Sequence, residues 1–198
     1  MQRLADGTPV ICHDYEVGGW RLEDLDAETF GSLCPDAPLL DSLLEWSRAR
    51  RFPLLLEVKD ASLLDALAAR LRETDPSLVT VASFHGPFLR DFAFACPGVL
   101  TSLMLGTVLD PDDMIELARG YRTRGVHPCW EARDPRPHRL LTQTAAARIR
   151  AAGLRLTLWH EERPEELGAL LRLAPDALCT NDPGLLKRLR DAPIPMRR

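Results

Sequence analysis

The stretch LLLEVKDASLLDALAARLRETDPSLVTVA, residues 54–82, decides the fold class of this chain. It opens with an apolar run at Leu54–Val58, continues as an amphipathic segment at Ser62–Arg72 and ends in a second apolar run at Leu78–Ala82. Strands that are apolar at nearly every position are typical of a parallel sheet, because helices cover both of its faces. The stretch therefore predicts a strand, a helix and a second strand parallel to the first.

The same alternation continues to the end of the chain. Further apolar runs lie at Val99–Met104, Gly125–His127, Leu154–Trp159 and Ala177–Thr180. Segments of helical length lie at Pro87–Cys96, Asp112–Arg122, Thr142–Ala152, Pro164–Leu173 and Pro183–Arg190. Such a series forms either a doubly wound sheet or a (β/α)₈ barrel. Because no G-x-G-x-x-G follows a strand, a dinucleotide-binding sheet is disfavoured and the barrel is preferred.

The chain has too few strands for a complete barrel, which needs eight. A short strand at Thr8–Cys12 follows an Asp6-Gly7 turn, and Met1–Leu4 is read as the end of its hairpin partner. We therefore predict a single domain over residues 1–198, a TIM (β/α)₈-type barrel that lacks the first βα unit and most of the second strand. Open strand edges in such a barrel favour a homo-oligomer that covers them.

Composition excludes several classes of function. Apolar residues make up 45% of the 198 residues and the net charge is −4, which argues against disorder and against a nucleic-acid partner. No apolar run reaches the length of a membrane-spanning helix, so no integral membrane segment is expected. The polar first residues, MQRLADGTPV, do not resemble a signal peptide. Five scattered cysteines without a C-x-x-C pair indicate a reducing, cytoplasmic location rather than a zinc site or a disulfide framework.

Glu57 and Lys59 stand two residues apart on a predicted strand, so both side chains point to the same face. In a barrel strand this face is the interior, where charges are costly unless they are paired or bind a ligand. One interpretation is a buried Glu–Lys pair with no function. The other is a carboxylate that binds Mg²⁺ or Ca²⁺ beside an ammonium that binds phosphate.

Histidines supply the candidates for proton transfer. His13 ends a strand and is followed by Asp14, although this pair alone also suits a surface loop. His127 ends a strand that faces the predicted mouth of the barrel and is a candidate pocket residue. His85 is expected in a loop and His138 in solvent. Residues expected to be solvated are the acidic run Asp24, Asp26 and Glu28, and Lys187 on the last helix.

Taken together, these motifs resemble the glycerophosphodiester phosphodiesterase family, a group of PLC-like phosphodiesterase barrels. LADGTPVICHD is similar to the family's T-x-D-G-x-P-V-x-x-H-D hairpin, and LLLEVK is similar to its E-x-K strand. GLRLTLW resembles the G-x-x-V-x-x-W strand, and PDALCTNDPGLL resembles the closing D-G-I-x-T-D-x-P segment. The motifs occur in the family's order and extend over essentially the whole chain.

The resemblance implies a metal-dependent hydrolase that converts glycerophosphodiesters into glycerol 3-phosphate and an alcohol. On this basis His13 is one of two catalytic histidines, which act as general acid and base. Glu57 is one of three carboxylate ligands of a divalent ion, Mg²⁺ or Ca²⁺. Lys59 contacts the phosphate, and Trp159 lines the glycerol side of the pocket.

The chain also departs from the family pattern. The family's H-R-G strand and E-x-D strand, which bear the other catalytic histidine and two metal carboxylates, have no counterpart in this sequence. The family's W-T-x-N is replaced by Trp159-His160-Glu161-Glu162, which is either an altered pocket or a set of surface substitutions. The family's T-D becomes Thr180-Asn181. We therefore expect an incomplete site in this chain, and the alternative function is a non-catalytic phosphoester-binding or interaction protein with the same barrel.

Overall fold

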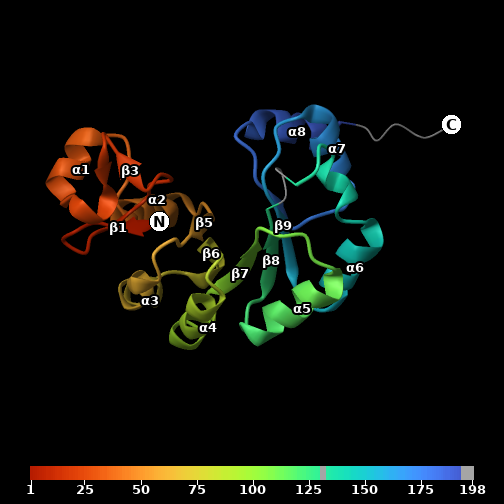
Figure 1. Cartoon of the computed structure of the whole chain (residues 1–198), viewed down its shortest axis with the longest axis horizontal. Coiled ribbons are helices and arrows are strands. Elements are labelled where there is room, and N and C mark those ends of the chain that lie inside the picture. Colours follow the sequence, from red (N-terminus) through yellow and green to blue (C-terminus); the bar gives the residue numbers. More distant parts are fainter. Residues whose placement is uncertain (130–132, 193–198) are drawn as a thin grey trace. The chain divides into compact units, whose positions relative to one another are not determined.

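The computed structural model describes residues 1–129 and 133–192, and its contacts divide the chain into two compact units. The first unit contains Met1–Ser102 and Tyr121–Thr123, and the second contains Leu103–Gly120 and the residues from Arg124 onward. In Figure 1 the first unit runs from red to yellow-green and the second from green to blue. Strand β7, at Leu100–Leu105, contains the point of division.

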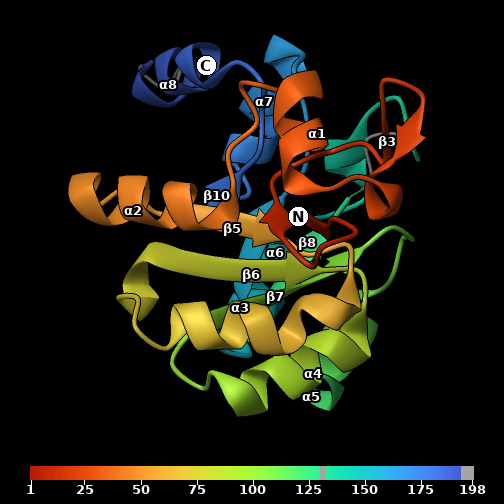
Figure 2. The same cartoon turned by 90° about the vertical axis from the view of Figure 1, so that its left-hand side faces the viewer.

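The first unit begins with short strands and continues as alternating helices and strands. Its elements are β1 Gln2–Arg3, β2 Pro9–Val10, β3 Glu16–Val17, β4 Trp20–Arg21, η1 Leu22–Asp24, α1 Ala27–Leu33, α2 Leu40–Arg50, β5 Leu54–Glu57, η2 Ala61–Leu63, α3 Leu64–Leu71, η3 Pro76–Leu78, β6 Val79–Ser83 and α4 Gly86–Ala95. Figure 2 shows α3 and α4 side by side next to β6.

The second unit continues the alternation. Its elements are α5 Pro111–Gly120, β8 Gly125–Pro128, η4 Pro137–Arg139, α6 Gln143–Ala151, β9 Arg155–Leu158, α7 Pro164–Leu171, β10 Ala177–Leu178 and α8 Pro183–Asp191. Thr142 caps α6 by accepting a hydrogen bond from the Ala145 amide at 3.1 Å. Gly153 follows α6 with a φ of +78°, the left-handed conformation that glycine favours after a helix.

Six of the strands form one sheet whose hydrogen-bonded order, β5 to β10, is also their order in the chain. The pairs β5–β6, β8–β9 and β9–β10 are parallel. The register places Leu56 beside Val81 and Val126 beside Leu156, all of which are buried. The predicted parallel α/β fold is therefore confirmed, with strand ends within a few residues of those expected. The single-domain organisation and the particular units that the barrel lacks stay predictions.

The predicted N-terminal hairpin is also confirmed. Strands β1 and β2 pair antiparallel, with Gln2 beside Val10, and Gly7 in the turn has a φ of +85° that favours glycine. This hairpin packs with the segment that follows it, and the shared core consists of Leu4, Val10, Leu22, Leu25 and Phe30.

The main chain of Met1 joins this hairpin to β5. Its nitrogen donates to the Glu57 carbonyl oxygen at 2.5 Å, and its carbonyl oxygen accepts from the Lys59 amide at 3.0 Å. Bonds from one residue to both neighbours of Val58 are the pattern of parallel pairing. The chain at Met1 is thus a parallel neighbour of β5, which brings the residues after β2 close to the end of β5.

Two local features were not predicted from the sequence. A second hairpin, β3–β4, turns at Gly18 and Gly19, which both have positive φ. Helix α1 begins where a solvated acidic run was expected. The carboxylates there are exposed, but Asp26 also caps α1 by accepting from the Thr29 amide at 2.8 Å, and this bond lowers the pKa of Asp26.

Within the described part of the chain, no helix combines the length and the apolar character that crossing a membrane requires.

Helix α4 offers a matched pair of substitutions. Phe92 is fully buried, whereas Phe94, two residues later, is 61% exposed with the Arg122 guanidinium 4.4 Å from its ring centre. We expect Phe92→Ala to lower the free energy of unfolding by about 3–5 kcal/mol, because it removes a buried ring and leaves a cavity. Phe94→Ala should cost about 1 kcal/mol or less, the worth of an exposed cation–π contact. Urea denaturation of both variants measures the difference, and equal losses would show that α4 packs in another orientation.

Candidate functional site

The first candidate cluster lies in the loop after β2. The Ile11 amide donates to the Pro38 carbonyl oxygen at 3.2 Å, and Val10 forms an antiparallel β-bridge with Leu39. These main-chain contacts fix the position of the residues from which the loop begins. His13 and Asp14 follow, and both side chains are largely exposed. Strand β2 ends at Val10, so His13 lies three residues beyond the strand that it was predicted to end.

The imidazole of His13 is hydrogen-bonded to the next residue. Its Nδ1 lies 2.8 Å from Asp14 Oδ1, which favours the tautomer that carries the proton on Nδ1. The Nε2 nitrogen is then the one available for proton transfer. Because the side chains of His13 and Asp14 are 83% and 76% exposed, this contact contributes at most about 1 kcal/mol and cannot fix the ring by itself.

Lys59 reaches this loop from the end of β5. Its Nζ donates to the His13 carbonyl oxygen at 2.6 Å and lies 5.2 Å from the centre of the Tyr15 ring. Lys59 and Glu57 are both half-buried, so neither points freely into bulk water. The structure thus brings together His13 and Lys59, which are 46 residues apart in the chain. The loop offers the ammonium group one carbonyl oxygen and one aromatic face.

The described residues do not fit a divalent metal ion. Within residues 1–129 and 133–192, no group of three or more His, Cys, Asp or Glu side chains is placed to hold a metal. Mg²⁺ and Ca²⁺ take several oxygen ligands, and the single carboxylate of Glu57 supplies too few. No catalytic step through a metal is therefore derived from this structure.

The second unit holds His127 at the end of β8, where a pocket residue was expected. His127 is 1% exposed, its ring centre lies 6.1 Å from that of Trp159, and its Nε2 lies 3.9 Å from Cys179 Sγ. Among the described residues, no hydrogen-bond partner satisfies its Nδ1. Burial lowers the pKa of His127 to about 4 and raises the pKa of Cys179 to about 11. Both groups are neutral at pH 7, so they do not form a thiolate–imidazolium nucleophile.

Trp159 follows β9 and pairs through its main chain with Cys129. A cavity of about 20 Å³ is lined by Trp159 together with Pro128, Pro137, Leu141, Leu158, His160 and Leu170. Such a space holds about one water molecule. This cavity is therefore too small for a glycerophosphate, and the assignment of Trp159 to substrate binding stays a prediction.

Glu161 connects the end of β9 to the start of α7. Its Oε1 accepts from the amides of Glu162 and Arg163 and from Arg163 Nε, each at 2.9 Å, and its Oε2 accepts from Arg163 Nη2 at 2.6 Å. Arg163 Nη1 then donates to the Pro135 carbonyl oxygen at 2.5 Å. These hydrogen bonds, led by those from the Arg163 side chain, lower the pKa of Glu161 to about 2. Glu161 thus stabilises a loop rather than transferring protons at neutral pH.

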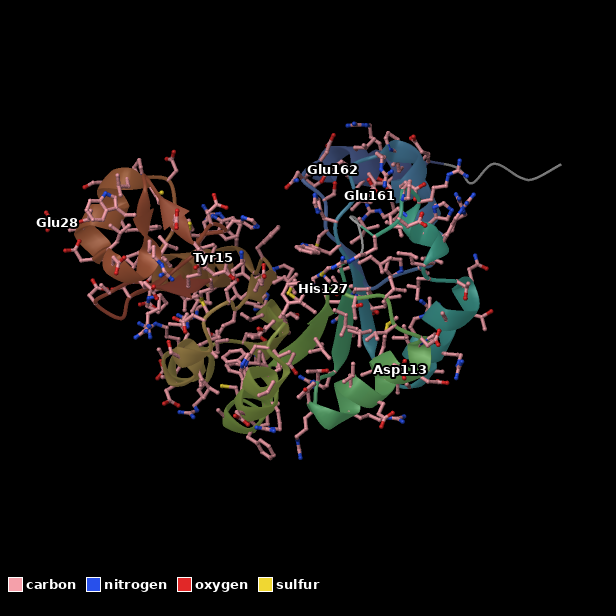
Figure 3. All side chains as sticks on the ribbon, viewed as in Figure 1. Tyr15, Glu28, Asp113, His127, Glu161 and Glu162 are labelled. Atoms are coloured by element: carbon pink, nitrogen blue, oxygen red, sulfur yellow. The ribbon has the colours of Figure 1, made fainter. Side chains whose placement is uncertain are left out.

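Glu162 links two loops of the second unit. Its Oε2 accepts from Thr180 Oγ1 at 2.9 Å and its Oε1 from the Asn181 amide at 2.7 Å, while His160 Nε2 lies 3.9 Å from the same Oε1. Glu162 therefore connects the residues after β9 to those after β10. Figure 3 shows Glu161 and Glu162 near each other and near the start of α7, with His127 on β8.

Two histidines differ from expectation. His85 lies in the expected loop, but it also caps α4, because its Nδ1 accepts from the Phe88 amide at 3.1 Å. The expectation that His138 lies in solvent is wrong. Its Nδ1 is 2.6 Å from Oε2 of the buried Glu166, so it joins η4 to α7. A buried carboxylate requires such a partner. Lys187, in contrast, is exposed as expected and pairs with Asp191.

Sequence reasoning missed two residues of the first cluster. Tyr15 places its ring against the Lys59 ammonium, and Gln2 donates to carbonyl oxygens of the His13 loop. Figure 3 labels Tyr15 within the first unit. The alternation of apolar and polar residues that reveals a strand does not show which polar side chain is buried, so no sequence signal identified Gln2.

Comparisons with known proteins identify the fold. No protein-family model and no curated protein matches the chain. Among solved structures, a candidate glycerophosphodiester phosphodiesterase from Galdieria sulphuraria has a TM-score of 0.78 and 22% identity, over 96% of this chain and 83% of that one. A glycerophosphodiester phosphodiesterase from Thermotoga maritima has a TM-score of 0.76 and 17% identity, over 96% and 82%. A phosphodiesterase from Oleispira antarctica, in complex with the product sn-glycerol-3-phosphate, has a TM-score of 0.77 and 17% identity, over 96% and 82%. The chain therefore has the fold that the sequence resemblance implied.

The bonds of Glu161 predict a dependence of stability on pH. Its pKa is about 2 in the folded protein against an ordinary value of 4.5, so the stabilisation is complete above pH 4.5 and is lost as the pH falls toward 2. Glu161→Gln should lower the free energy of unfolding by about 2 kcal/mol at neutral pH, since it weakens hydrogen bonds to a charged group.

Unfolding in urea at several pH values tests this. The difference between wild type and Glu161→Gln should shrink as the pH falls from 4.5 to 2. Glu165→Gln, which removes an exposed carboxylate from the first turn of α7, controls for loss of charge alone. A constant difference across this range would show that Glu161 does not bind Arg163 as a carboxylate.

Proposed function

We propose that this chain is a phosphodiesterase of the glycerophosphodiester phosphodiesterase type, whose substrates are small glycerophosphodiesters and whose products are glycerol 3-phosphate and an alcohol. The observation that carries this proposal is the 2.6 Å hydrogen bond from Lys59 Nζ to the His13 carbonyl oxygen. This bond joins a cation to the main chain of a histidine on a fold shared with phosphodiesterases, and the Oleispira antarctica structure is a complex with sn-glycerol-3-phosphate.

His13 is the proton-transfer group in this proposal. With Nδ1 bound to Asp14, its Nε2 takes a proton from the entering nucleophile or gives one to the leaving oxygen. The wide exposure of the ring leaves this nitrogen accessible to a ligand from solvent.

Lys59 is the phosphate-binding group. An ammonium group has three N–H donors, and the His13 carbonyl oxygen uses one of them. Two donors are left for phosphoryl oxygens, so Lys59 can hold the loop and stabilise the negative charge of the transition state together.

Glu57 and the residues of the second unit have smaller roles. Glu57 is proposed as one carboxylate ligand of Mg²⁺ or Ca²⁺, although the described residues do not complete such a site. Trp159 is proposed to line the glycerol side of the pocket, and His127 to offer a neutral ring nitrogen to a substrate hydroxyl group. Because much of the charge stabilisation in phosphodiester cleavage depends on a metal, we expect slow turnover from these residues alone.

A non-catalytic phosphoester-binding protein is the second candidate function. The absence of a metal-binding cluster from the described residues favours it. Such a protein would keep Lys59 as an anion-binding group, and His13 would then serve only the structure of the loop.

Hydrolysis of glycerophosphocholine by the 198-residue chain, with Mg²⁺ or Ca²⁺ present, tests these proposals. We expect choline release well below the typical enzyme range of about 1–10³ s⁻¹, and a further fall of about 10²-fold or more in His13→Asn. Rates in the typical range would contradict the incomplete site. Release equal to the uncatalysed rate would contradict the hydrolase and favour the binding protein.

Titration with glycerol 3-phosphate, followed by NMR, tests phosphate binding separately. Lys59 and Lys187 are the two lysines of the chain, so they form a matched pair. Lys59→Met should weaken binding by about tenfold or more, because it removes a charged donor to phosphate. Lys187→Met removes an exposed ammonium bound to Asp191 and should leave binding unchanged. Absence of binding together with absence of turnover would contradict both functions.

A further inference from the structure

Gln2 is a buried polar residue that contacts the His13 loop directly. It is 5% exposed, and its Nε2 donates to the Asp14 carbonyl oxygen at 2.7 Å and to the Cys12 carbonyl oxygen at 3.2 Å. The same Nε2 lies 3.5 Å from the His13 carbonyl oxygen. A carboxamide has two N–H donors, and the two shorter bonds use both of them.

Lys59 completes the set of donors. Lys59 donates to the His13 carbonyl oxygen, and Gln2 donates to those of Cys12 and Asp14. Three consecutive carbonyl groups therefore accept hydrogen bonds from these two side chains. Bonds to successive carbonyl groups fix the planes of the peptides between them. The directions in which the side chains of His13 and Asp14 leave the main chain are then fixed too.

Gln2 itself belongs to a rigid part of the first unit. It pairs with Val10 in the β1–β2 hairpin, and the preceding residue, Met1, is hydrogen-bonded to β5 on both sides of Val58. The donor and the strand that carries Lys59 are therefore joined through main-chain bonds. Gln2 and Lys59, which both hold the loop, therefore cannot move independently of each other.

We propose that Gln2 is a positioning residue for His13: the Gln2 carboxamide holds the main chain of residues 12–14 and thereby fixes the direction in which the imidazole leaves it. This inference rests on the proposed function, in which His13 transfers a proton. Proton transfer requires the ring to be held within about 0.5 Å of its productive position. The exposed His13–Asp14 contact is too weak to provide this, so buried donors beneath the loop must.

The wild-type protein provides the first test. Gln2 and Gln143 are the two glutamines of the chain, and Gln143 is an exposed residue whose Nε2 lies 3.4 Å from the Arg172 carbonyl oxygen. By NMR, the side-chain amide protons of Gln2 should exchange with solvent about tenfold more slowly, or slower still, than those of Gln143. Equal exchange of the two amides would overturn the proposal without any substitution.

Gln2→Met provides the second test, because methionine has a similar length and no donor. We expect the backbone amide order parameters of Asp14 and Tyr15 to fall from about 0.85 to below about 0.6, and the ¹⁵N signals of the His13 imidazole to shift as its bond to Asp14 loosens. Gln143→Met should change neither. If Gln2 only fills space, methionine will leave the order parameters of the loop and the His13 ¹⁵N signals unchanged. That result would overturn the proposal.

Turnover separates this inference from the proposed function. Where choline release is measurable, Gln2→Met should lower kcat with little change in KM, since Lys59 still binds phosphate. Where the chain does not hydrolyse glycerophosphocholine, the hydrolase proposal fails while the NMR measurements still decide the role of Gln2. If Gln2→Met does not fold, the exchange rates of the wild-type amides decide it.

Discussion

The ammonium group of Lys59 sets the arrangement of the first unit. Lys59 is half-buried, and a partner for its charge offsets the hydration that burial removes. Here the partners are the His13 carbonyl oxygen and the Tyr15 ring, both in the loop that follows the N-terminal hairpin. Satisfying one charge therefore ties the end of β5 to the loop that follows the hairpin.

In the second unit, hydrogen bonds within the unit satisfy the carboxylate groups. Glu161 binds Arg163 and two amides, Glu162 binds Thr180 and Asn181, and the buried Glu166 is matched by His138. These carboxylates all stabilise the segments that follow β8, β9 and β10. His127 differs from them, because it is buried, neutral and unsatisfied at Nδ1 within the described residues.

Much of the fold could be predicted from the sequence, because apolar runs such as Leu54–Val58 and amphipathic stretches such as Ser62–Arg72 carry a clear period. The hairpin was predictable from Asp6-Gly7. The roles of Gln2, His138 and Glu161 were not, since each depends on a partner brought near by folding or on a loop geometry without a pattern. The two-residue strands β3 and β4 are likewise too short for a periodic signal.

The account depends most directly on the contact between Lys59 and the loop that carries His13. Nuclear Overhauser effects between the ε-methylene protons of Lys59 and the ring protons of Tyr15 measure this contact in solution. The 5.2 Å between Lys59 Nζ and the Tyr15 ring centre predicts that these effects are observed at neutral pH. Their absence, with Lys59 showing the averaged shifts of a freely rotating side chain, would contradict the account.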